Sequence, residues 1–163
     1  MPFGLSSGAG VIFGVTGGVT EAVLRRLVAD SGMEALNEIK FTGIRGTKGI
    51  KEAVIPYGDR QLKIAVVSGL KNADELIQKI KSGEVQYDFV EVMACPGGCV
   101  GGGGQPIHEG KELASDRGSN LYFLDKTAHL RFSHENPDIK HLYDEYFGSP
   151  GSHKAHQLLH VQK

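Results

Sequence analysis

Residues 91–106 constrain this chain more than any other segment, because they combine its only two cysteines with six glycines. Cys95 and Cys99 are separated by three residues, a spacing at which two thiolates can reach one inorganic cluster. The flanking glycines let the backbone approach sulfur and iron without a clash with Cβ. The segment therefore predicts a loop that holds an inorganic group, although an ordinary iron–sulfur cluster uses four cysteines.

Other interpretations of the two cysteines remain open. They could be small buried residues in a tight turn, but the density of neighbouring glycines argues against this. The loop could cradle a phosphate, but it lacks both a Gly-Lys-Ser/Thr ending and an adjacent basic residue. The pair could also take up zinc, or two chains could pool their cysteines in a dimer.

Glycine makes up 23 of the 163 residues and is concentrated in two segments, residues 4–18 and 97–104. No short repeat links them, so the chain is neither collagen-like nor a low-complexity linker. The two clusters predict two places where backbones approach each other or a ligand closely.

Length and charge limit the remaining possibilities. With 163 residues and 40% hydrophobic side chains, residues 1–163 are expected to form a single domain. The net charge of −1 and the mixed signs along the chain favour neither nucleic acid nor an anionic membrane surface as a partner. We expect no membrane span and no secretory signal, and two cysteines so close together favour metal or redox chemistry in the cytoplasm.

Hydrophobic periodicity predicts an alternation of strands and helices. Glycine stops are expected at Gly32 and Gly83, a hairpin turn at residues 57–60, and a capping role for Asn72. The predicted strands are residues 11–15, 39–44, 53–55, 62–67 and 89–93. The predicted helices are residues 19–30, 72–82, 112–124, 138–147 and 152–160.

The order strand, helix, strand before the cysteine loop indicates a βαβ unit, and α/β sheets place ligands at the carboxyl ends of such strands. We expect an α/β fold with a mainly parallel sheet of about four or five strands flanked by helices, and a helical C-terminal segment.

Several other polar residues are assigned ordinary roles. His153, His156 and His160 fall on one face of a helix but have no nearby carboxylate or cysteine, so we expect them to face solvent. Glu91 alternates with its valine neighbours and is expected on the other face of its strand. Gly8 and Gly10 do not match a dinucleotide fingerprint. Solvated helix faces are predicted for Asp116, Arg117, Asp138, Asp144 and Glu145.

Residues 93–106 (Met-Ala-Cys-Pro-Gly-Gly-Cys-Val-Gly-Gly-Gly-Gly-Gln-Pro) resemble the third signature of the iron-only, di-iron hydrogenases. Residues 13–22 (Phe-Gly-Val-Thr-Gly-Gly-Val-Thr-Glu-Ala) are similar to another glycine-rich segment of that family. The C-terminal stretch is similar as well, through Leu121-Tyr, Arg131-Phe-Ser, Asn136-Pro, Leu142-Tyr and residues 152–160.

The resemblance implies one lobe of a two-lobed catalytic domain in which a 4Fe-4S cubane is linked to a di-iron centre that interconverts protons and dihydrogen. It implies that Cys95 binds the cubane and that Cys99 both binds it and bridges to the di-iron unit. Met93 would line the di-iron pocket, and Phe13 and Val19 would belong to its apolar surroundings and gas path. Thr20 departs from the family, which often has methionine there.

The family's two other cubane cysteines, and its cysteine and lysine for proton delivery and cyanide binding, come from signatures upstream of this segment. We therefore expect the upstream half of the catalytic domain as a partner, a redox partner such as ferredoxin or a nicotinamide-linked subunit, and self-association through an apolar face. Alone, the chain is expected to be inactive and to lack the complete cluster.

The alternative is a non-catalytic iron–sulfur protein of the cytosolic cluster-assembly type, which shares a similar cysteine-glycine signature. The Thr16–Val19 segment and the unbroken glycines at 101–104 favour the hydrogenase.

Overall fold

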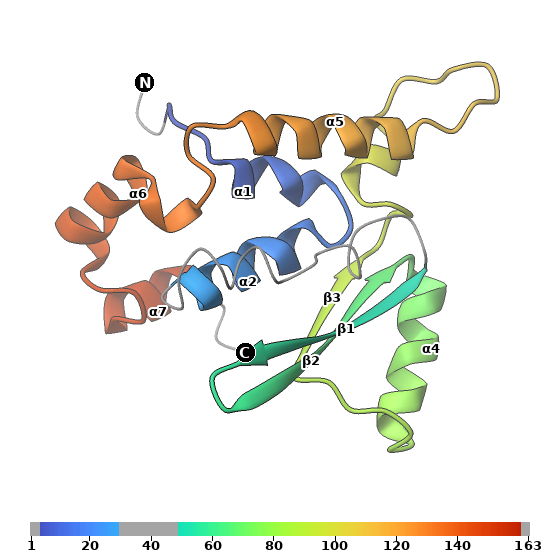
Figure 1. Cartoon of the computed structure of the whole chain (residues 1–163), viewed down its shortest axis with the longest axis horizontal. Coiled ribbons are helices and arrows are strands. Elements are labelled where there is room, and N and C mark those ends of the chain that lie inside the picture. The colour runs from blue at the N-terminus through green and yellow to red at the C-terminus, as the bar shows by residue number, and fades with distance from the viewer. Residues whose placement is uncertain (1–3, 30–48, 161–163) are drawn as a thin grey trace.

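A computed structural model describes residues 4–29 and 49–160 of the chain. In the described residues a three-stranded sheet carries a helix on each face, and a group of further helices packs beside it (Figure 1). The strands are β1 (Ile50–Tyr57), β2 (Arg60–Ser68) and β3 (Phe89–Met93). Helix α2 (Gly18–Ala29) covers one face, and α4 (Leu70–Lys81) covers the other.

The sheet is mixed. Strands β1 and β2 form an antiparallel hairpin whose register ends at the pair Tyr57 and Arg60, with Gly58 in the turn at a φ of 57°. Strands β2 and β3 are parallel and are joined through α4, which confirms the predicted βαβ unit. The expected sheet of four or five mainly parallel strands is wrong for the described residues. A two-residue hairpin can only join antiparallel strands, and the predicted strand at residues 39–44 and the stop at Gly32 lie outside the described part.

The prediction of a strand at residues 11–15 is also wrong. These residues form the end of α1 (Gly8–Val11) and a 3-10 turn (Ile12–Gly14). The Ser7 hydroxyl caps α1 by accepting a hydrogen bond from the Gly10 amide. A short apolar run is equally compatible with a buried helical segment. Here the capping hydrogen bond of Ser7 favours the helix.

Helix α4 begins earlier than predicted. Its first residue is Leu70 and its N-cap is Gly69, which has a φ of 89°. Asn72 is therefore inside the helix instead of capping it, and its amide Nδ2 donates to the Ser68 carbonyl at 2.6 Å. The side chain ties the first turn of α4 to the end of β2. Helix α4 ends as predicted, before a left-handed Gly83.

The C-terminal part is helical, as predicted. Helix α5 (Ala114–Thr127) lies beside α1 in Figure 1, and α6 (Pro137–Leu142), a π-helical turn (Tyr143–Phe147) and α7 (His153–Leu159) follow. Asn136 caps α6 and Ser152 caps α7. The predicted helix 138–147 is divided because its last turn changes to π geometry.

A buried ionic network joins α2 to α5. Arg25 makes two hydrogen bonds of 2.7 Å to the Asp125 carboxylate and one of 2.5 Å to Glu21. Arg131 contacts Asp125 at 2.8 Å. Burial alone would raise the pKa of Asp125, but the hydrogen bonds from Arg25 and Arg131 hold it below its usual range. Gly8 packs so closely on Asp125 that a Cβ there would collide with the carboxylate.

Candidate metal centre

The two cysteines lie in a loop that starts where β3 ends, at the carboxyl edge of the parallel pair. Cys95 and Cys99 are both exposed and neither forms a disulfide. Cys99 opens a short 3-10 turn, Cys99–Gly101. Across residues 4–29 and 49–160, no three His, Cys, Asp or Glu side chains are grouped closely enough to hold a metal ion. The described residues therefore offer a two-thiol site that leaves room for ligands from elsewhere.

The end of β2 holds one side of the cysteine loop. The Gly97 amide donates to the Ser68 hydroxyl at 2.7 Å, and the Gly69 amide donates to the Met93 carbonyl at 2.8 Å. The first contact joins the last residue of β2 to the cysteine loop, and the second joins the residue after β2 to the last residue of β3. The parallel pairing of the two strands thus fixes the position at which the loop leaves the sheet.

The first glycine-rich segment forms a second side. The Thr16 amide donates to the Gly97 carbonyl at 3.0 Å. Gly98 has a φ of 90°, and a Cβ there would lie 2.8 Å from the Thr16 nitrogen and 2.9 Å from the Gly14 oxygen. Only glycine fits this position without a shift of backbone. The two glycine clusters of the sequence thus form one close contact.

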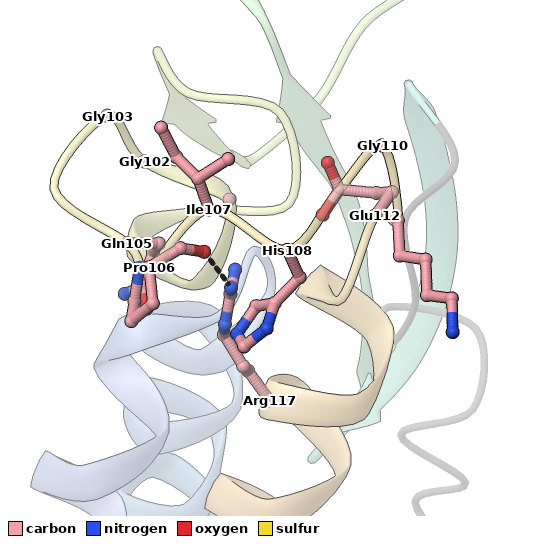
Figure 2. A pocket seen from close by; sticks show the side chains of 11 residues that line it. Gly102, Gly103, Gln105, Pro106, Ile107, His108, Gly110, Glu112 and Arg117 are labelled. Carbon is pink, nitrogen blue, oxygen red and sulfur yellow. Dashed lines mark hydrogen bonds between the residues drawn. The ribbon is translucent and has the colours of Figure 1, made fainter.

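Arg117 of α5 holds the far end of the loop. Its Nη1 donates to the Val100 carbonyl at 2.9 Å. Its Nη2 donates to the Pro106 carbonyl, also at 2.9 Å (Figure 2). The prediction that Arg117 is merely solvated is wrong, because a guanidinium presents several donors in a fixed fork that matches two nearby carbonyls. An open pocket of about 390 Å³ lies beside it, between the glycines and residues 105–112.

Thr16 also supplies an unused polar group next to the loop. Its side chain is fully buried, and its hydroxyl has no hydrogen-bond partner among the described residues. Buried hydroxyls are normally paired, and sulfur atoms of an iron–sulfur cluster accept hydrogen bonds from the protein. The two thiols, the close glycine packing and this hydroxyl together fit a cluster at the loop.

Glu91 lies on the other face of β3 from its neighbours, as predicted, but α2 covers that face. Glu91 is therefore only 6% exposed. It accepts hydrogen bonds from the Gly17 amide at 2.6 Å, the Thr20 amide at 2.7 Å and the Thr20 hydroxyl at 2.6 Å. Sequence reasoning missed this role. The available signal was an acidic residue inside an otherwise apolar strand.

Lys51 lies on β1 in register with Val66, which in turn is in register with Glu91. The lysine is buried, and burial lowers its pKa to about 8, although the negative charge of Glu91 acts in the opposite direction. One buried basic and one buried acidic group thus lie on the two outer strands, β1 and β3, with Val66 of β2 between them.

The residues that the resemblance assigns to the cofactor pocket lie on the elements that lead into this region. Met93 ends β3 and is half-buried, Phe13 lies in the 3-10 turn and is 45% exposed, and Val19 is half-buried in the first turn of α2. Phe13 and Val19 thus flank the Gly14–Thr16 turn that touches the cysteine loop. Their roles stay predictions.

The histidines of α7 are exposed, as predicted. The Nδ1 atoms of His156 and His160 lie 2.8 Å apart. In the part of the chain that the structure describes, no helix has the length and apolar character needed to cross a bilayer.

Comparison with known proteins places both halves of the chain in one class. Residues 1–103 match the family described as "Iron only hydrogenase large subunit, C-terminal domain", and residues 111–162 match "Iron hydrogenase small subunit". The NADP-reducing hydrogenase subunit HndD of Solidesulfovibrio fructosivorans is 49% identical over 161 residues, which are 98% of this chain and 27% of that protein.

Two further similarities bear on the site. A solved structure of a variant of the [FeFe]-hydrogenase HydA1 from Chlamydomonas reinhardtii matches with a TM-score of 0.65 and 39% identity, covering 97% of this chain and 47% of that one. Cytosolic iron-sulfur assembly component 3 of Bos taurus is 35% identical over 152 residues, 91% of this chain and 31% of that protein. The chain thus spans less than half the length of these proteins.

Proposed function

The chain belongs to the iron-only hydrogenase family, and from this premise we propose that it forms part of a hydrogenase catalytic centre. In this proposal Cys95 and Cys99 would hold a 4Fe-4S cubane, and Cys99 would also bind the di-iron centre linked to it. The reaction is the reversible reduction of protons to dihydrogen. The observation that carries the proposal is the cysteine loop itself, which two strand ends, the Gly14–Thr16 turn and Arg117 hold in place while both thiols remain exposed.

The residues of this chain would do three things at that centre. The two thiolates would bind iron, and thiolates of this kind are stabilised by nearby backbone amides and by the metal. The Thr16 hydroxyl would donate a hydrogen bond toward a sulfur atom, and such bonds adjust the potential of a cluster. Met93, Phe13 and Val19 would exclude water from the di-iron pocket. The complete cofactor would supply the hydride chemistry.

The chain alone offers two of the four thiolates that a cubane requires. We propose that the upstream half of the catalytic domain supplies the rest, and that ferredoxin or a nicotinamide-linked subunit exchanges electrons with the assembled enzyme. The chain by itself would be inactive and largely free of the di-iron centre. A cytoplasmic location and self-association of the isolated chain stay predictions.

The second candidate is an iron–sulfur protein without hydrogenase activity, and the identity to the iron-sulfur assembly component supports it. The higher identity to HndD favours the hydrogenase.

Co-expression with the missing segment distinguishes the hydrogenase from the non-catalytic iron–sulfur protein. The chain would be produced with a segment that carries the missing cysteines and with the hydrogenase maturation proteins, and the purified complex would be assayed for hydrogen evolution and by infrared spectroscopy. The proposal predicts activity together with carbonyl and cyanide stretching bands. Cubane absorption without those bands or activity would identify the assembly-type protein.

A further inference from the structure

Glu91 connects the strand that leads to the cysteines with the helix that precedes them in the chain. It lies four residues before Cys95 on β3, and its carboxylate receives the three hydrogen bonds from Gly17 and Thr20 described above. All three distances fall between 2.6 and 2.7 Å, the range of charge-assisted bonds. A side chain that is distant in sequence therefore does the work of an N-cap for α2.

The helix start that Glu91 holds is continuous with the turn that touches the cysteine loop. Gly17 follows Thr16 directly, and the Thr16 amide donates to the Gly97 carbonyl. Gly97 lies between Cys95 and Cys99. A path of hydrogen bonds and two peptide units thus runs from the Glu91 carboxylate to the backbone that carries both thiols.

Two independent features strengthen this hold. The negative carboxylate lies at the amino end of a 12-residue helix, where the helix dipole favours it. The buried Lys51 adds a positive charge on the opposite side, two strands away across the sheet. Two backbone amides thus donate to the Glu91 carboxylate, and the positive charge of Lys51 offsets its negative charge. Both interactions hold the carboxylate in place.

Thr20 is part of the same arrangement. Its side chain is fully buried and its hydroxyl makes one of the three bonds. A methionine at this position would have no donor for Glu91, so the threonine adds a contact that a thioether cannot make.

We propose that Glu91 is a positioning residue for the cysteine loop and that the Thr20 hydroxyl completes its hold on α2. Glu91 acts through the Gly17–Thr16–Gly97 connection and sets how firmly Cys95 and Cys99 are held for chelation. The chelation part of this inference rests on the proposed function, whereas the connection between Glu91 and the loop does not.

The first arm of the test needs no metal. Amide hydrogen exchange would be measured residue by residue by NMR for the wild-type chain, E91Q, T20V and T20S, with E75Q on the exposed face of α4 as the matched control. E91Q should accelerate exchange about tenfold at Gly17 and Thr20, because their amides donate to the buried carboxylate. Exchange at Thr16 should also rise, because its bond to the Gly97 carbonyl is continuous with the helix start that Glu91 holds. T20V should accelerate amide exchange at the same residues by a smaller factor, about threefold. T20S restores the hydroxyl and should return exchange to the wild-type rate.

Cadmium alone is the probe in the second arm, because its thiolate charge-transfer absorption reports chelation by both cysteines. E91Q should weaken binding about tenfold, the lower end of what changes around metal ligands cost, while E75Q leaves it unchanged. Uniform acceleration of exchange across α4 and the sheet would overturn the inference, as would wild-type cadmium affinity in E91Q. A wild-type chain that binds no cadmium would instead contradict the proposed cysteine site, and the exchange arm would still decide the role of Glu91.

Discussion

The Thr16 amide donates a 3.0 Å hydrogen bond to the Gly97 carbonyl, and this contact joins the two glycine-rich segments of the chain. Gly98, the next residue, packs against the same turn with a positive φ. The contact accounts for the need for glycine at position 98. The two segments form one interface that holds the exposed cysteines.

Replacing Gly98 by alanine tests this interface. The added Cβ would meet two backbone atoms and would require a left-handed conformation, so G98A should lower the free energy of unfolding by about 1–3 kcal/mol. G103A is the matched control, because a Cβ at Gly103 would meet nothing within 4 Å. Urea denaturation measures both. Equal stability of the two variants would show that the close contact does not exist in solution.

The Arg25–Asp125 pair should be essential for packing α2 against α5. D125N removes the charge that neutralises a buried guanidinium, and breaking a buried pair in this way costs about 3–5 kcal/mol. D116N changes an exposed residue of the same helix and should have little effect. Chemical denaturation at neutral pH gives the difference.

The same pair has a pH signature. The pKa of Asp125 is lower in the folded chain than in the unfolded chain. Its contribution to the free energy of unfolding is therefore fully present above the unfolded pKa of a carboxyl, and it is lost as the pH falls through the folded pKa. The stability difference between wild type and D125N should therefore shrink in acid. A difference that stays constant down to the acid limit of folding would show that folding does not lower the pKa of Asp125.

Lys51 should make the chain more stable as the pH rises from about 8 toward 10. In that range the unfolded chain still carries a proton on this lysine, whereas the folded chain has released it. The gain should be about 1–2 kcal/mol, since one pKa unit corresponds to about 1.4 kcal/mol. K51M should lack the rise. An identical pH profile for both proteins would mean that the amine is solvated in the folded state.

Arg117 should protect the segment after the cysteine loop. R117Q loses the two-carbonyl contact, so residues 105–112 should open more often and trypsin should cut after Lys111 about threefold faster. K126Q, on the exposed surface of the same helix, is the control. Unchanged cleavage in R117Q would show that the loop is held by other contacts.

The parts of the fold that could be predicted from sequence are those with a long local signal. Helices α2 and α4, the hairpin at Tyr57–Arg60 and strand β3 were expected from periodicity and glycine stops, and the structure confirms them. The first apolar run failed because five residues do not separate a strand from a helical turn. The start of α4 was misplaced because a glycine with positive φ, not Asn72, precedes it.

The site shows the same division. The cysteines and the glycines around them identify a cluster loop from local sequence alone. Glu91, Ser68 and Arg117 could not be assigned, because their partners lie 11 or more residues away, and only the folded chain brings them together. Buried polar contacts between distant elements produce no periodic pattern in a single sequence, so periodicity does not predict them.

The central claim is that Cys95 and Cys99 are two ligands of a cubane completed by another segment. Iron and acid-labile sulfide, counted per complex after anaerobic purification, test it most directly. The co-expressed complex of wild-type chain and upstream segment should carry a full cubane, and the double variant C95S, C99S should lose it, as should the wild-type chain alone. A full cubane in the double variant, or in the isolated chain, would contradict the account.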